Sequence, residues 1–226
     1  MVDELHTINI TQTNLDQWVI RLRIPEGEGP HPVMLLLHGW TGDENSMWIF
    51  TSRLPKEMLL IVPRGLYSTP LGGFGWHQYQ GGTWPRMDDF RDAVEAITEL
   101  LVPENFLDFL VDETSFSRIR MLGFSQGAAL ASVYAMMHPN RVVSFAGLSG
   151  FLPDGSSSII TSRPLKNIPA FIAHGTKDEL VPVERARRGV GVLRKAGAVV
   201  TYCEDDVGHK LSLSCFQGLE SFFYRN

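Results

Sequence analysis

The chain has 226 residues, of which 44% are hydrophobic, and its formal net charge at pH 7 is −5. This length and apolar content are enough to bury a large core, so we expect a single domain over residues 1–226. The acidic balance argues against nucleic acid or an anionic membrane as a main partner. The longest aliphatic run, Val33–Leu37, is far too short to span a bilayer.

The N-terminus and the cysteines indicate the compartment. Residues 1–6 are acidic and carry no apolar run like that of a signal peptide. Cys203 and Cys215 form no closely spaced metal or redox motif; they could pair, but we favour two buried thiols in a reducing compartment. A cytoplasmic protein is therefore expected, and the sequence leaves a homodimer open.

Strand and helix patterns alternate along most of the chain. Period-two alternation predicts strands at Leu5–Ile10 and Trp18–Ile24, joined as an antiparallel hairpin through the turn-like residues 14–17 at one sheet edge. Apolar runs typical of buried strands lie at 33–37, 58–62, 119–123, 142–148 and 168–173, and a last strand at 198–203. Helices are expected at 46–53, 87–101, 126–137, 183–196 and 211–224, with Pro103 starting a second segment or kinking the second helix. This order predicts an α/β fold with a mainly parallel sheet and helices on both faces.

Residues 63–85 form the one long irregular stretch. It contains six glycines at positions 65, 72, 73, 75, 81 and 82, and the aromatic residues Tyr67, Phe74, Trp76, Tyr79 and Trp84. Long loops in compact domains are usually functional or disordered, and disordered segments are poor in aromatics. We therefore expect an ordered loop at a binding site.

The sequence Gly123-Phe124-Ser125-Gln126-Gly127 follows a buried strand and opens a helix of small and apolar residues. This G-x-S-x-G pattern is typical of a nucleophile elbow, in which the serine sits on a sharp strand-to-helix turn. The serine backbone should be strained, at a cost of about 1–3 kcal/mol. Side chains at the two flanking glycines would collide where strand and helix close together, and the helix N-terminus favours a developing oxyanion.

A serine hydroxyl needs a base, and the base needs a group that orients it. In enzymes with this elbow the chain order is Ser, then Asp or Glu, then His, and Ser125, Asp178 and His209 follow it, each just past a predicted strand. Asp178 alone would suit a turn or cap, and His209 alone a surface position. Other acids could in principle orient His209, namely Asp154, Asp205 and Asp206. His38 and His174 are interpreted as structural.

Acyl transfer also needs donors for the oxyanion, each worth about 2.7–4 kcal/mol. The backbone N–H of Gln126, directly after the nucleophile, is one expected donor. The loop after an earlier strand should supply the other, which indicates the backbone N–H of Trp40. Because backbone groups do this work, the side chains at both positions are free to vary.

Four segments together resemble the phospholipase/carboxylesterase family of α/β-hydrolases, which includes small bacterial carboxylesterases and acyl-protein thioesterases. They are Leu36-Leu37-His38-Gly39, residues 123–127, His174-Gly175-Thr176-Lys177-Asp178 with the following residues to Pro182, and Gly208-His209. The resemblance implies an α/β-hydrolase fold without a large cap domain, a triad of Ser125, Asp178 and His209, and Trp40 and Gln126 as oxyanion donors. This chain departs from the family by Trp40 in place of a common leucine, and by Gly72-Gly73-Phe74-Gly75-Trp76-His77 in place of a Gly-Gly…Trp-Phe-Asp pattern.

The sequence therefore predicts a serine carboxylesterase that hydrolyses short- to medium-chain or aryl esters through an acyl-enzyme, without metal or organic cofactor. An acyl thioesterase or lysophospholipase with the same triad is the alternative within enzymes, and a non-catalytic binding protein on a hydrolase scaffold is the alternative outside them. The expected pocket residues are apolar and aromatic side chains of the loops: Trp48, Phe74, Trp76, Trp84 and Phe151.

Overall fold

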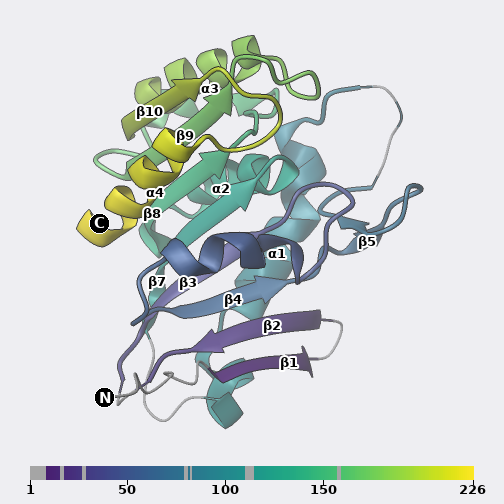
Figure 1. Ribbon diagram of the computed structural model, residues 1–226, viewed down its shortest axis with the longest axis vertical. Coiled ribbons are helices and arrows are strands. Elements are labelled where there is room, and N and C mark those ends of the chain that lie inside the picture. The colour runs from purple at the N-terminus through teal and green to yellow at the C-terminus, as the bar shows by residue number, and fades with distance from the viewer. Residues whose placement is uncertain are drawn as a thin grey trace.

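The computed structural model of the chain describes residues 9–15, 18–26, 29–78, 81, 83–109, 115–156 and 159–226. Within these residues, eight strands form one sheet in the order β1-β2-β4-β3-β7-β8-β9-β10 (Figure 1). The strands are β1 (Asn9–Leu15), β2 (Trp18–Ile24), β3 (Pro32–Leu37), β4 (Leu59–Pro63), β7 (Ser115–Phe124), β8 (Val142–Leu148), β9 (Pro169–Gly175) and β10 (Val199–Asp205).

Strands β4, β3, β7, β8, β9 and β10 run parallel, and β2 pairs antiparallel with both β1 and β4. The mainly parallel sheet with an antiparallel N-terminal hairpin is therefore confirmed. Of the predicted first strand, residues 9 and 10 lie in β1 and residues 5–8 lie outside the described residues. Its predicted end was wrong, because β1 continues through Asn14 to Leu15, which pairs with Trp18. The backbone pairing with β2, which runs from Asn9–Ile24 to Leu15–Trp18, carries the strand past Asn14.

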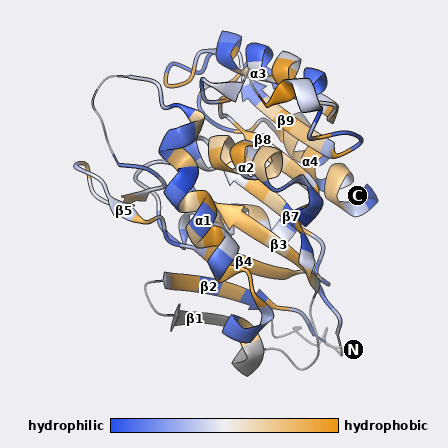
Figure 2. Cartoon of the chain, turned by 180° about the vertical axis from the view of Figure 1, so that it is seen from behind, coloured by the Kyte–Doolittle hydropathy of each residue, from blue (hydrophilic) through white to orange (hydrophobic). Residues whose placement is uncertain are grey.

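Helices cover both faces of the sheet. Successive strand residues alternate between faces, so Leu35 packs in one apolar cluster with α1 (Arg91–Leu100), α2 (Gln126–Met137) and α3 (Val183–Lys195). Leu36 packs in a second cluster with η1 (Ser46–Arg53) and α4 (Leu213–Arg225). Figure 1 shows α4 in front of the sheet, and the reverse view in Figure 2 shows α1 and α2 in front of strands whose central parts are hydrophobic.

Several short segments are 3₁₀ helices. The predicted helix at 46–53 has those bounds but is 3₁₀ (η1). The helix predicted from residue 87 begins as η2 (Met87–Phe90) and becomes α1 at Arg91, and Pro103 opens the separate segment η3 (Pro103–Phe109). The remaining ones are η4 (Pro139–Arg141) and η6 (Ile160–Ser162).

Residues 63–85 are more regular than predicted, although Tyr79 and Gly82 lie outside the described residues. The short strands β5 (Tyr67–Ser68) and β6 (Phe74–Gly75) pair as an antiparallel hairpin, which Figure 1 shows on the side toward which β4 points. Gly73 at its turn has φ +69°, and a Cβ there would lie 2.0 Å from the Thr41 carbonyl oxygen. Glycine thus lets the hairpin approach the loop after β3.

The two cysteines form a disulfide, with Cα atoms 5.6 Å apart. The prediction of two free thiols was wrong, because β10 and the first turn of α4 bring Cys203 and Cys215 together across the loop between them. Disulfides persist mainly in oxidising compartments. The cysteines therefore give no support to a cytoplasmic location.

No helix within the described residues is long and apolar enough to cross a membrane.

Candidate active site

Ser125 occupies the sharp turn between β7 and α2, with φ +52° and ψ −114°. This conformation is rare for a residue with a side chain, so the predicted strain is present. A Cβ at Gly123 would lie 2.2 Å from the Gly127 carbonyl oxygen, and one at Gly127 would lie 2.1 Å from the carbonyl oxygen of Leu37. Both glycines are therefore required, the first by the helix and the second by the neighbouring strand β3.

Asp178 lies in the loop after β9 and holds His209 in the loop after β10. Its Oδ2 accepts a hydrogen bond from His209 Nδ1 at 2.7 Å, and its Oδ1 accepts from the backbone N–H groups of Leu180 and Val181 at 3.0 and 2.9 Å. The Asp178 side chain is fully buried, whereas the His209 side chain is 18% exposed. A carboxylate held in this way fixes the imidazole tautomer that leaves Nε2 as the acceptor.

The other acids weighed from the sequence are engaged elsewhere. Asp206 pairs with Lys177 Nζ at 2.7 Å, Asp205 accepts from Ser214 Oγ at 2.7 Å, and Asp154 pairs with Arg188 at 3.2 Å. His174 Nε2 is 2.8 Å from the Val181 carbonyl oxygen, so its interpretation as a loop-stabilising residue fits its contacts.

Phe124 links Ser125 to His209. The Phe124 ring precedes the serine in the elbow and lies edge-on to the His209 imidazole, with ring centroids 5.1 Å apart. Among the described contacts Ser125 Oγ forms no hydrogen bond to His209, and such bonds commonly tighten only when substrate is bound. The ring of the residue before the predicted nucleophile thus packs against the predicted base.

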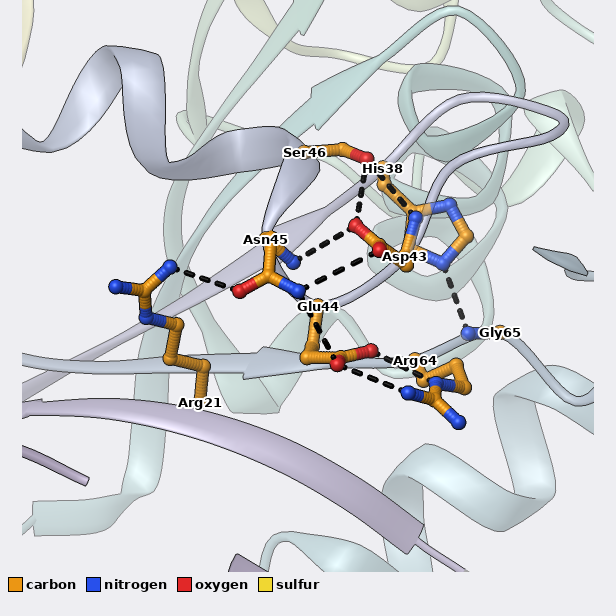
Figure 3. Close-up of polar contacts among 8 residues, drawn as sticks. All are labelled: Arg21, His38, Asp43, Glu44, Asn45, Ser46, Arg64 and Gly65. Carbon is orange, nitrogen blue, oxygen red and sulfur yellow. Dashed lines mark hydrogen bonds and ion pairs between the residues drawn. The ribbon is translucent and has the colours of Figure 1, made fainter. Parts of the chain in front are cut away.

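The loop after β3, which carries Trp40, is fixed by a buried histidine. His38 Nδ1 donates to the Gly39 carbonyl oxygen at 2.7 Å, and His38 Nε2 accepts from the Gly65 N–H at 2.8 Å (Figure 3). Burial lowers the pKa of His38 and keeps the imidazole neutral, as the accepting Nε2 requires. His38 is therefore structural, as predicted, and joins the Trp40 loop to the start of the 63–85 segment.

An ion pair joins the same two segments. Arg64 Nε and Nη2 donate to the two carboxylate oxygens of Glu44 at 2.7 and 2.9 Å (Figure 3). The Glu44 side chain is 3% exposed and that of Arg64 is 30% exposed. Burial opposes ionisation of Glu44, but the hydrogen bonds from Arg64, a backbone hydrogen bond and the Arg64 charge together outweigh it and hold the pKa of Glu44 below its ordinary value.

Trp76 and the Gln126 side chain complete the connection. Trp76 Nε1 donates to the His38 carbonyl oxygen at 2.8 Å, and the Trp76 backbone N–H donates to Gln126 Oε1 at 2.8 Å. The Gln126 side chain thus has a structural role that the sequence did not indicate, because its buried amide ties the Trp76 segment to the elbow. The backbone N–H of Gln126 starts α2 and has no acceptor one turn earlier.

Ser125 opens into a cavity of about 430 Å³. Of the five predicted pocket residues, Trp84 and Phe151 line this cavity and pack edge-on at 5.0 Å. The other lining residues are Trp40, His77, Thr83, Pro85, Gln126 and Leu180.

Trp48, Phe74 and Trp76 do not line this cavity. Trp76 is fully buried against His38. Trp48 lies under the Arg21 guanidinium at 4.2 Å, and Phe74 lies under that of Arg64 at 4.6 Å. The sequence showed that these residues were near the site but not which way each ring faced.

The site residues that the sequence did not indicate lie in loops. Leu180 and His77 line the cavity, and Glu44 and Arg64 support the Trp40 loop. For Glu44 and Arg64, the available signal in the sequence was their opposite charge, one in the loop after β3 and the other at the start of residues 63–85. Within the described part of the chain, no three histidine, cysteine or acidic side chains are grouped to hold a metal ion.

Comparison with known proteins shows the family of the chain. The family model described as phospholipase/carboxylesterase matches residues 22–226. Acyl-protein thioesterase 1 of Emericella nidulans is 27% identical over 73% of this chain and 76% of its own length. A rice (Oryza sativa subsp. japonica) protein named a probable inactive carboxylesterase is 30% identical, and the match spans 62% of this chain and 57% of the relative.

Solved structures share the fold. The carboxylesterase of Bacillus cereus superposes with a TM-score of 0.76 at 18% identity, over 93% of this chain and 95% of that one. The carboxylesterase of Mesorhizobium loti gives 0.76 at 21% identity, over 96% and 100%. The fold is thus that of the α/β-hydrolases, as the resemblance implied. The chain belongs to the phospholipase/carboxylesterase family.

Proposed function

We propose that the chain is a serine carboxylesterase that acts through an acyl-enzyme. The observation that carries this is the 2.7 Å bond from His209 Nδ1 to the buried Asp178 carboxylate. The strained elbow at Ser125 supports it, since the preceding Phe124 packs against the His209 ring. His209 Nε2 takes the Ser125 proton as Oγ attacks the ester carbonyl. Asp178 then stabilises the imidazolium.

The remaining steps follow from the same groups. The backbone N–H groups of Trp40 and Gln126 bind the oxyanion of the tetrahedral intermediate. His209 protonates the departing alcohol. It later removes a proton from the water that attacks the acyl-enzyme and returns it to Ser125 Oγ as the acyl–serine bond breaks. Each step conserves its protons among serine, histidine, alcohol and water, so neither metal nor organic cofactor takes part.

The cavity supports short- to medium-chain or aryl esters as substrates. Its apolar wall of Trp84, Phe151 and Leu180 suits an acyl group, and its volume of about 430 Å³ lies at the lower end of ligand pockets. Activity that rises steadily into the long-chain range would contradict this part of the proposal.

Hydrolysis of p-nitrophenyl esters from acetate to palmitate tests the function. Ser125→Ala and Asp178→Asn should each lower kcat/KM by at least about 10³-fold. Asp206→Asn is the matched control, because Asp206 neighbours His209 in sequence but pairs with Lys177; it should retain activity within about threefold, since exposed ion pairs contribute little. A wild type that is folded but inactive on every ester would contradict the proposal.

A thioesterase is the second candidate, because relatives named acyl-protein thioesterase 1 match most of the chain. The same triad would attack a thioester. Comparing kcat/KM for a butyryl ester and the corresponding thioester separates the two, with a preference for the thioester of more than tenfold favouring this candidate. The name of the rice relative raises a non-catalytic role, and the position of Asp178 against His209 argues against it here.

A further inference from the structure

A second cavity of about 270 Å³ lies on the other side of the Trp40 loop. It is bounded by the Gly39–Gly42 segment, by η1 and by Phe124, and Trp40 lines both this cavity and the one that contains Ser125. The proposed mechanism uses only the cavity that contains Ser125. The second cavity therefore has no role in that mechanism.

The second cavity begins next to the nucleophile. A Cβ at Gly39 would lie 3.2 Å from both Ser125 Cβ and Phe124 Cδ1, so the backbone that forms one wall of the cavity lies directly against the elbow. Phe124, which forms another wall, packs against the His209 ring at 5.1 Å. The cavity thus adjoins the serine on the side of Phe124 and the imidazole.

The reaction distinguishes the two sides of the serine. His209 gives its proton to the oxygen of the departing alcohol, so that oxygen must lie within hydrogen-bond reach of the imidazole. The carbonyl carbon bonds to Ser125 Oγ, and the acyl group extends away from the leaving oxygen. The alcohol is therefore held on the side nearer His209, where Phe124 lies.

We propose that the cavity between the Trp40 loop, η1 and Phe124 is the subsite for the alcohol part of the ester, and that it takes an apolar, ring-sized alcohol such as a benzyl group. This inference rests on the proposed esterase function. Met47, Phe50 and Ile49 supply an apolar floor and rim. The polar side-chain atoms among the lining residues are the hydroxyls of Thr41 and Ser46 and the indole N–H of Trp40. No charged side chain lines it, so an anionic or cationic alcohol is disfavoured.

Ile49 is the residue at which to test the subsite. Its side chain is 73% exposed at the rim, whereas Met47 and Phe50 are buried in the core. A tryptophan at position 49 can therefore narrow the subsite without disturbing the core. Leu180 is the matched control, since it is 68% exposed and lines the other cavity.

The first experiment measures kcat/KM for ethyl butyrate, benzyl butyrate and ethyl hexanoate. Ile49→Trp should lower the ratio of kcat/KM for benzyl butyrate to that for ethyl butyrate about tenfold, because a pocket that no longer fits a few carbons of the substrate loses about this much. It should leave the ratio of kcat/KM for ethyl hexanoate to that for ethyl butyrate within about twofold of the wild-type value. Leu180→Trp should do the reverse. An Ile49→Trp variant that changes acyl-length preference instead would overturn the assignment and place the acyl chain in this cavity.

The second experiment isolates the alcohol side. Acyl-enzyme made from p-nitrophenyl butyrate is partitioned between water and added benzyl alcohol. The alcohol oxygen attacks the acyl carbon and its proton passes to His209. The bond to Ser125 Oγ then breaks as His209 returns this proton to Oγ, which gives benzyl butyrate. Ile49→Trp should reduce the benzyl butyrate to butyrate ratio about tenfold, and Leu180→Trp should leave it unchanged. Equal ratios in wild type and Ile49→Trp would refute the subsite. Activity that survives Ser125→Ala would instead refute the esterase function, so the two failures are distinct.

Discussion

Breaking the Glu44–Arg64 pair should cost very different amounts of stability depending on which partner is removed. Arg64→Met leaves the Glu44 carboxylate, 3% exposed, without its two strongest donors. Loss of one partner of a buried ion pair costs about 3–5 kcal/mol. We expect a loss of about 3 kcal/mol for this variant.

Glu44→Gln should cost only about 1 kcal/mol, which is the range of an exposed pair. The Arg64 side chain is 30% exposed, so water reaches its guanidinium while it stays over the Phe74 ring at 4.6 Å. The double variant Glu44→Gln with Arg64→Met should be more stable than Arg64→Met alone, because the buried charge is gone.

Urea unfolding followed by circular dichroism measures these free energies, and kcat for p-nitrophenyl acetate measured below the transition reports on the loop that carries Trp40. The reasoning is refuted if Glu44→Gln destabilises the chain as much as Arg64→Met does. It is also refuted if the double variant is no more stable than Arg64→Met.

Three further predictions concern the supports of the site. The double variant Cys203→Ser with Cys215→Ser should lose about 3 kcal/mol of unfolding free energy, since the disulfide closes a loop with a sequence separation of 12. Thermal unfolding with and without reductant measures this loss. A wild-type Tm that does not change with reductant would contradict it. Gln126→Leu leaves the buried Trp76 N–H without its acceptor and should cost about 1–3 kcal/mol, as measured by denaturant unfolding against the wild type; no loss would mean that the loop finds another acceptor. Because burial depresses the pKa of His38, its contribution to stability is present above the unfolded value of about 6.5 and is lost as pH falls through the folded pKa. His38→Gln should therefore flatten the fall in stability below about pH 6.5, and equal slopes in the two proteins would count against a neutral buried imidazole.

The sequence was enough to predict the parallel sheet and the positions of Ser125, Asp178 and His209 at strand ends. These features depend on local signals. Apolar runs mark the buried strands, and the elbow needs its two glycines because a Cβ at either position would lie 2.1 or 2.2 Å from a backbone oxygen. Because parallel strands end at one edge of the sheet, residues that follow different strands meet there. The local strand patterns were therefore enough to predict that these three residues, far apart in the sequence, lie at one edge of the sheet.

Side-chain orientation in the long loop could not be predicted in the same way. Trp76 and Trp84 both lie in a glycine-rich stretch, yet Trp76 is buried with its indole N–H on His38 and Trp84 lines the cavity. Which ring faces inward depends on the β5–β6 hairpin and on contacts with distant segments. The pairing of Cys203 with Cys215 was missed for the same reason, because it depends on how α4 packs beside β10.

Covalent labelling with a fluorophosphonate, followed by peptide mass spectrometry, tests the central claim without knowledge of the natural substrate. The account predicts stoichiometric labelling on Ser125, none in Ser125→Ala, and labelling slowed at least about 10²-fold in His209→Ala, with Asp206→Asn labelled like the wild type. Labelling at another serine, or labelling of Ser125 at an undiminished rate in His209→Ala, would contradict it.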